Sequence, residues 1–219
     1  PEELKGKAAR EESARRQAAR VERAARDEIV AGQEWGVRLG DVDLARADLA
    51  HLRETVLVSD TAAHLFSGTL QEAIDPHGRL TRAQAEAALL AAAAEDVYDA
   101  LPGGWQGRID EKGRGLSGGQ RQRLVLARTL VLDPETLILV EPTSAVDAHT
   151  EARIAERLAS HRRGRTTVVV TASPLMLRQC DEIVVLAGGR EVARGSHDEL
   201  RTHPDYHRVI ARGMEDDDE

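Results

Sequence analysis

Residues 116–124 read Leu-Ser-Gly-Gly-Gln-Arg-Gln-Arg-Leu, and this stretch decides the fold. A serine followed by two glycines opens a strong amphipathic helical pattern that runs from Ser117 to Leu132. Amides at the start of a helix favour negative charge, and glycine lets an anion approach the backbone closely. The stretch therefore predicts an anion-binding helix start, with a plain serine-capped helix as the alternative.

A second informative stretch follows this helix. Asp133-Pro134 ends the helical pattern, and residues 137–147 then read Leu-Ile-Leu-Val-Glu-Pro-Thr-Ser-Ala-Val-Asp. An apolar strand that ends in a carboxylate and a tight turn presents an acid at the C-terminal edge of an α/β sheet. Glu141 is the acid that this pattern places there.

Short apolar strands alternate with helical patterns along most of the chain. The strands are predicted at 37–39, 55–59, 137–140, 166–172 and 182–186, and the helices at 81–100, 117–132 and 150–160. A glycine pair at 188–189 predicts a hairpin turn. Because the central strands are apolar on both faces, we expect an α/β fold with a mainly parallel sheet.

Composition sets further bounds. With 219 residues, 41% of them hydrophobic, the chain can bury one sizeable core. The net charge of −8 argues against a broad electropositive surface for binding nucleic acid, so we expect no nucleic-acid partner. No apolar run approaches the length of a membrane span. The single cysteine, Cys180, excludes an intrachain disulfide, and the eight histidines show no metal-ligand spacing, so no metal site is predicted.

Two regions outside the core pattern are rich in charge. Residues 1–31 are mostly Ala, Arg and Glu, which favours a helix with a thin apolar face. Residues 162–165 read Arg-Arg-Gly-Arg and are predicted to form a solvated loop, with contact to lipid head groups or a partner as the alternative. Residues 213–219 are predicted to be an acidic, solvated tail.

The order and spacing of these motifs resemble the nucleotide-binding domain of ATP-binding cassette (ABC) transporters. Residues 137–141 look like its Walker B strand, and residues 65–70 and 110–113 resemble segments of exporters whose permease is fused to the ATPase. The likeness covers residues 36–212. The resemblance assigns the signature motif to Leu116, Ser117, Gly118, Gly119 and Gln120, and the D-loop to Ser144, Ala145, Val146 and Asp147.

This resemblance implies an ABC ATPase core with a mainly parallel sheet. The nucleotide-binding domain would span 32–212, with a helical subdomain at about 79–115. Residues 1–31 would form a helix in place of the P-loop region. We also expect the chain to be part of a longer one with membrane helices upstream.

Several positions depart from the family pattern. The Walker A loop needs glycines and a lysine, but residues 11–20, where it should lie, contain neither. The Walker B aspartate that helps to hold Mg²⁺ is replaced by Val140. The switch histidine is replaced by Ser173, and the Q-loop glutamine position falls on Thr61.

The missing P-loop has a large energetic consequence. Losing about four hydrogen bonds to charged groups, at roughly 1.5–3 kcal/mol each, removes about 6–12 kcal/mol. A micromolar site is worth about 8 kcal/mol in total. We therefore expect no ATP or Mg²⁺ on the isolated chain, and negligible hydrolysis at its own site.

Two interpretations of Glu141 remain open. The resemblance implies that it polarises the attacking water. Alternatively, it only caps the turn that follows, or it is a remnant with neither metal nor nucleotide near it. The departures at the neighbouring positions favour the second interpretation.

The signature motif retains a use, because in this family it covers ATP held by a partner domain. The chain would then be a degenerate domain that supplies its signature in trans, at the cytoplasmic face of the plasma membrane. Its partners would be a second nucleotide-binding domain, in a homodimer or a heterodimer, and the permease. Two alternatives remain: a fragment of an ordinary ATP-hydrolysing subunit, and a nucleotide-free structural or regulatory module.

Overall fold

A computed structural model of the chain describes residues 36–215. The chain divides into two units, residues 1–54 and 55–219. In the first unit, an antiparallel pair of two-residue strands, β1 (Arg38–Leu39) and β2 (Val42–Asp43), precedes helix α2 (Leu49–Thr55). The helix predicted at 1–31 lies outside the described residues, as do the last four residues of the predicted acidic tail.

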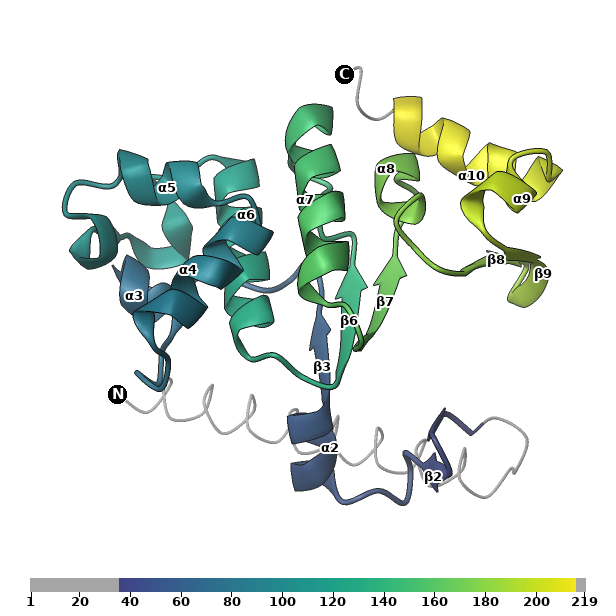
Figure 1. The fold of residues 1–219 in the computed structure, drawn as a ribbon, viewed down its shortest axis with the longest axis horizontal. Helices are drawn as coiled ribbons and strands as arrows, with labels where there is room; N and C mark the ends of the chain where they lie inside the picture. The colour runs from purple at the N-terminus through teal and green to yellow at the C-terminus, as the bar shows by residue number, and fades with distance from the viewer. Residues whose placement is uncertain (1–35, 216–219) are drawn as a thin grey trace, which may run out of the picture. The chain divides into compact units, whose positions relative to one another are not determined.

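The second unit is built on a parallel three-stranded sheet (Figure 1). Its strands are β3 (Val56–Ser59), β6 (Thr136–Val140) and β7 (Thr166–Val170), in the order β3-β6-β7. Both pairings are parallel and in continuous register. The predicted α/β class with a parallel sheet is thus confirmed, and each of these strands lies within the stretch predicted for it or extends one residue beyond it.

The two faces of this sheet differ in the cover that they receive. Leu137 and Leu139 of β6 are buried in the main core, together with apolar residues of α6 (Gly118–Val131) and α7 (Ala148–His161). On the opposite face, Val58 is 58% exposed and Val168 of the same register row is 45% exposed. Among the described residues, therefore, only one face of this apolar sheet is well covered.

A group of short elements packs against α6, to the left of it in Figure 1. It contains two strands, three α-helices and two 3₁₀ turns: β4 (Gly68–Thr69), α3 (Leu70–Ile74), α4 (Arg82–Ala91), α5 (Glu95–Ala100), η1 (Gly104–Gln106), β5 (Arg108–Ile109) and η2 (Glu111–Gly113). Trp105 anchors this group, because it is buried beside the Tyr98 ring at 5.6 Å and beneath the Arg82 guanidinium at 5.3 Å. The group continues the core of the sheet without a break.

The single helix predicted at 81–100 is wrong, because two helices occupy this stretch. Helix α4 ends at Ala91, and α5 begins at Glu95 after a buried turn of three alanines. Ala93 adopts a left-handed conformation, with φ at 51°, which turns the chain. Because alanine has the highest helix propensity, local propensity predicts that the helix continues through this stretch and does not indicate the corner.

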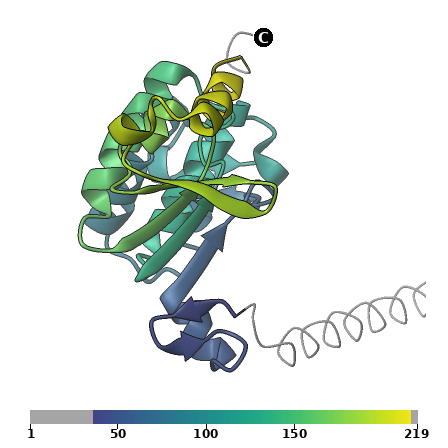
Figure 2. The ribbon, with the colours of Figure 1, turned by 90° about the vertical axis from the view of Figure 1, so that its right-hand side faces the viewer.

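The C-terminal part of the unit forms a second, smaller core. Strands β8 (Ile183–Ala187) and β9 (Arg190–Gly195) make an antiparallel hairpin (Figure 2). Gly188 and Gly189 both adopt positive φ at its turn, as the glycine pair predicted. The helices of this part are α8 (Pro174–Leu177), α9 (His197–Leu200) and α10 (Pro204–Glu215). Tyr206 is fully buried among residues of the hairpin and α9, and the half-buried Cys180 packs against the same cluster.

The prediction of a solvated loop at 162–165 is wrong for its first residue. The Arg162 side chain is buried and pairs with Asp133 at 3.2 Å. It also donates to the carbonyl oxygens of Glu135 and Thr166. Arg162 thereby joins the end of α7 to the starts of β6 and β7, whereas Arg163 is exposed as expected.

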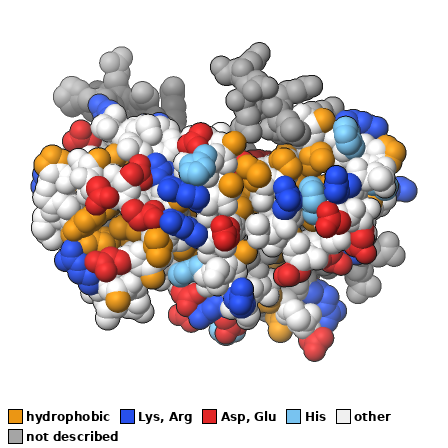
Figure 3. Space-filling view, turned by 45° about the horizontal axis from the view of Figure 1, so that its top comes forward, with side chains coloured by type: hydrophobic (Ala, Val, Ile, Leu, Met, Phe, Trp, Pro, Cys, Tyr) orange, Lys and Arg blue, Asp and Glu red, His pale blue; other side chains and the backbone are white. Residues whose placement is uncertain are grey.

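Charged side chains of both signs are interspersed on the face drawn in Figure 3, with apolar patches between them. No single acidic area stands out among the described residues on that face (Figure 3). Exposed ion pairs such as Arg82–Glu86 and Arg194–Glu182 illustrate this mixing elsewhere in the described chain.

Candidate functional site

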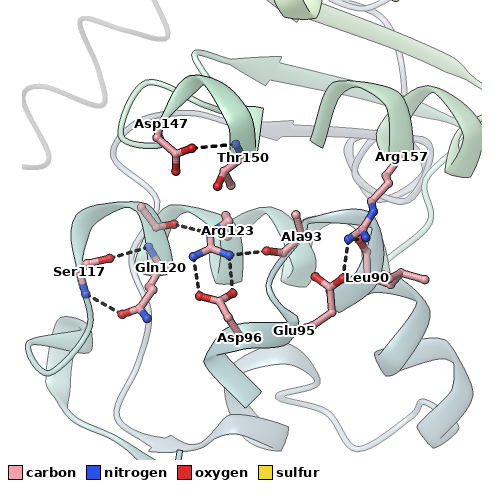
Figure 4. Close-up of polar contacts among 11 residues, drawn as sticks. Leu90, Ala93, Glu95, Asp96, Ser117, Gln120, Arg123, Asp147, Thr150 and Arg157 are labelled. Atoms are coloured by element: carbon pink, nitrogen blue, oxygen red, sulfur yellow. Dashed lines mark hydrogen bonds and ion pairs between the residues drawn. The ribbon is translucent and has the colours of Figure 1, made fainter. Parts of the chain in front are cut away.

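The signature motif forms the N-terminus of α6, as the sequence predicts. Ser117 is the N-cap, and its hydroxyl accepts a hydrogen bond from the Gln120 amide at 3.1 Å. The Gln120 side chain accepts one in return from the Ser117 amide at 2.9 Å, which closes a capping box (Figure 4). A hydroxyl that accepts one hydrogen bond can still donate another, so the exposed Ser117 can still bind an anion.

The two glycines of the motif serve different purposes. A methyl group at Gly119 would lie 2.8 Å from the carbonyl oxygen of Ala145, so this position requires glycine for packing inside the chain. A methyl group at Gly118 would meet nothing closer than 3.8 Å. The packing of this chain therefore does not require glycine at 118.

The D-loop lies directly beside the signature. Gln122, one turn into α6, donates to the carbonyl oxygen of Glu141 and to the Ser144 hydroxyl, each at 3.0 Å. Its own side-chain oxygen accepts from the Ala145 amide at 2.8 Å. Gln122 thus fixes both ends of the turn that leads from β6 into the D-loop, although the sequence analysis did not single it out.

The last D-loop residue starts the next helix. Asp147 is the N-cap of α7, and its carboxylate accepts from the Thr150 amide at 2.9 Å (Figure 4). This backbone hydrogen bond, together with the Thr150 side chain, holds the pKa of Asp147 below its usual value. The predicted signature and D-loop residues therefore meet at the adjoining N-termini of two 14-residue helices.

Glu141 terminates β6 in a left-handed backbone conformation, with φ at 46°. Its amide donates to the carbonyl oxygen of Val170, and its carboxylate accepts from the Thr171 hydroxyl at 3.2 Å. The same Thr171 oxygen accepts from the amide of Ser173, the residue at the switch position, at 3.1 Å. The structure therefore brings Glu141 and Ser173 together through Thr171.

The neighbouring positions offer little to a metal ion. Val140 is a half-buried, apolar residue and provides no oxygen atom to Mg²⁺. Ser173 is the N-cap of α8, where its hydroxyl accepts from the Met176 amide at 3.3 Å. The side chain at position 140 thus does not fit the Mg²⁺-binding role that the resemblance gives to this position. Within residues 36–215, no group of three His, Cys, Asp or Glu side chains is arranged to hold a metal ion.

A cavity of about 410 Å³ joins several of the predicted positions. It is lined by the ends of β3 and β6, by the first turns of α6 and by the D-loop, so that Thr61, Val140, Glu141, Gly118 and Ser144 share it. Ser117, Gln120, Asp147 and Ser173 lie outside the lining. Thr61 lies two residues beyond the end of β3 and is exposed. It offers a hydroxyl where the resemblance places the longer amide side chain of the Q-loop glutamine.

Residues 65–70, which resemble a segment of fused-permease exporters, are partly exposed. Leu65 is buried, whereas the Phe66 ring that follows is 76% exposed. The Leu65 side chain lies next to Gly113 of the 3₁₀ turn η2: a methyl group on Gly113 would be 3.4 Å from the Cδ1 atom of Leu65. An exposed aromatic side chain is suited to docking into a partner.

Two arginines beneath the signature were also missed by the sequence analysis. Arg123 of α6 is buried and pairs with Asp96 of α5, while Arg157 of α7 pairs with Glu95 (Figure 4). Burial alone would raise the pKa of Asp96, but the hydrogen bond and charge of Arg123, with the Gln120 side chain, hold it below its usual value. No local pattern marks Asp96 or Glu95, because both lie on a short helix with other exposed acids nearby.

Comparison with known proteins identifies the family. The model of the ABC transporter family matches residues 20–144. The chain is 40% identical over 183 residues to an ATP-dependent lipid A-core flippase of Alkalilimnicola ehrlichii, covering 82% of this chain and 31% of that protein. It is also 40% identical over 181 residues to a multidrug efflux ATP-binding/permease protein of Mycobacterium bovis, covering 81% and 15%.

A solved structure leads to the same conclusion. The chain superposes on a bacterial Atm1-family ABC exporter with ATP bound, with a TM-score of 0.74 and 32% identity over 83% of this chain and 32% of that one. The chain thus belongs to the ABC transporter family and is related to the ATPase domains of its exporters. It spans about a third or less of each of these relatives. Within residues 36–215, no helix has the length and apolar character to cross a membrane.

Proposed function

We propose that this chain is a degenerate nucleotide-binding domain of an ABC exporter that supplies its signature motif to ATP held by a partner domain. The observation that carries the proposal is that the signature turn is intact and accessible. Its capping box is complete, its N-terminal residues are exposed, and Gly118 is a glycine that the fold of the chain does not require. A phosphate approaching the first amides of α6 would need the space that a side chain at 118 would fill.

The same chain is poorly equipped to hydrolyse ATP at a site of its own. Val140 and Ser173 replace the residues that would hold Mg²⁺ and sense the γ-phosphate, and the sequence lacks a P-loop. Glu141 retains a carboxylate, and its Oε2 atom accepts from the Thr171 hydroxyl. These observations favour the trans-acting role over that of an ordinary hydrolysing subunit, since the replaced residues lie well inside the chain.

The role requires a two-domain assembly. The partner would bind ATP and Mg²⁺, while this chain would present the Ser117 hydroxyl and the amides of Gly118 and Gly119 to the phosphates. The exposed Phe66 supports a contact with a permease, which would place the assembly at the cytoplasmic face of the plasma membrane. Closure of the two domains would then be coupled to transmembrane transport.

The direct test is the ATPase rate of the complete exporter that contains this domain. Gly118→Ala is expected to lower the rate at least tenfold, since a methyl group would block the phosphate from the amides. Gly115→Ala is the matched control, because that glycine is also exposed, has no positive φ, and would place its methyl group 3.9 Å from the nearest atom. Equal rates for the two variants would refute the trans-acting role and favour the nucleotide-free module.

The isolated chain gives a second test. In a calorimetric titration with Mg-ATP, we expect no binding up to millimolar concentration. Clear binding would mean that the chain has a phosphate site of its own, and the description of the domain as degenerate would have to be abandoned.

A further inference from the structure

The corner between α4 and α5 is held by two arginines that come from different helices. Arg157 of α7 donates to the carbonyl oxygen of Leu90 at 2.9 Å and pairs with Glu95 at 2.5 Å. Arg123 of α6 donates to the carbonyl oxygen of Ala93 and pairs with both oxygens of Asp96 (Figure 4). Each arginine therefore binds one corner carbonyl and one carboxylate.

Only one of the two arginines also reaches the signature. The Nε atom of Arg123 donates to the carbonyl oxygen of Gly119 at 3.3 Å. Its guanidinium thus links the first turn of α6 to the α4–α5 corner. Arg157 forms no hydrogen bond or ion pair with the described residues of α6, and its side chain is 32% exposed, against 10% for Arg123.

The acceptors around Arg123 are arranged in a way that lysine cannot reproduce. Arginine presents five donors in a rigid planar fork, and here that fork serves two carbonyl oxygens and a bidentate carboxylate. An ammonium group has a single donor centre and cannot span these acceptors. Asp96 is 53% exposed, so its carboxylate can be replaced without opening a cavity.

We propose that Arg123, held by Asp96 and the α4–α5 corner, is a positioning residue for the signature turn. It fixes the carbonyl of Gly119 and thereby the direction of the Gln120 amide, which lies in the same peptide plane. This inference rests on the proposed function in one respect only, namely that the signature turn binds the phosphates of ATP on a partner domain. The geometric relation itself can be tested on the chain without ATP or a partner.

Hydrogen exchange of the 219-residue chain provides that test. Arg123→Lys and Asp96→Asn should each speed exchange of the Gln120 and Arg121 amides about tenfold, the effect of losing a hydrogen bond to a charged group. Exchange in β6 and α7 should stay unchanged. Arg157→Lys is the matched control, and it should leave the Gln120 and Arg121 amides at their original rates.

Three outcomes would overturn the proposal. Unchanged exchange at Gln120 and Arg121 in both variants would show that Arg123 does not fix the turn. An equal increase across β6 and α7 would show that Arg123 only stabilises the fold. An equal effect of Arg157→Lys would show that the turn depends on the corner as a whole. None of these results depends on whether the exporter uses the signature in trans, so failure of this inference is distinguishable from failure of the proposed function.

Discussion

Gly119 lies so close to Ala145 that a methyl group on it would stand 2.8 Å from the Ala145 carbonyl oxygen. The same methyl group would be 3.3 Å from Cγ1 of Val146. The signature and the D-loop of one chain are thus packed backbone against backbone. This contact separates the role of Gly119 from that of Gly118, which the sequence alone treats as a pair.

Gly119→Ala is therefore expected to destabilise the chain by about 1–3 kcal/mol, because the D-loop backbone must shift. Gly118→Ala should be neutral or slightly stabilising, since alanine is the better helix former and meets no close atom. Urea unfolding followed by circular dichroism measures both. A similar loss for the two variants would contradict the packing argument.

Glu141→Gln distinguishes the two interpretations of that residue. The amide oxygen of glutamine can still accept from the Thr171 hydroxyl, so the fold should be preserved. In the complete exporter, we expect the ATPase rate to stay within about twofold, because removing a working general base typically costs a hundredfold or more. A loss of that size would mean that Glu141 acts on the attacking water.

Arg162 should contribute more to stability than its place in a basic run suggests. Arg162→Met removes the donors to the carbonyl oxygens of Glu135 and Thr166. It should lower the free energy of unfolding by about 1–3 kcal/mol. The exposed neighbour gives the control: Arg163→Met should change it by less than about 0.5 kcal/mol. Denaturant unfolding of the two variants measures this. A smaller loss of unfolding free energy for Arg162→Met than for Arg163→Met would contradict the structural role of the buried Arg162 side chain.

Stability should fall as the pH is lowered into the acid range. The pKa of Asp147 is held down in the folded chain, mainly by the hydrogen bond from the Thr150 amide. The unfolded chain therefore binds a proton at a higher pH, and the stabilisation from this carboxylate is lost as the pH falls from about 5 through the lowered pKa. Asp147→Asn keeps the helix cap but cannot titrate, so its unfolding free energy should depend less steeply on pH. Thermal unfolding between pH 7 and the acid range, compared with the parent chain, tests this; equal slopes would exclude Asp147 as a contributor.

Much of the fold could be read from local pattern. The helix predicted at 117–132 is observed as α6 (Gly118–Val131), and the strand at 137–140 is observed one residue longer. Both have strong local signals, a serine cap with two glycines and an unbroken apolar run. The parallel arrangement was also predicted, since strands that are apolar on both faces are typical of parallel sheets. By contrast, α8 and the strands of two residues are too short to show a period.

The sequence by itself therefore indicated the family, through the order and spacing of several motifs. It also determined the capped signature turn and the acid that follows β6, because each of these two features is written in adjacent residues. Only the tertiary structure decided which distant groups meet. Arg123 pairs with Asp96 across 27 positions, and Arg157 pairs with Glu95 across 62. Such partners are determined by how the helices pack. Nothing in the alanine run at the α4–α5 corner predicts that arginines of other helices donate to the backbone carbonyls of the corner. Gly118 and Gly119 are alike in sequence, and only the position of the D-loop distinguishes them.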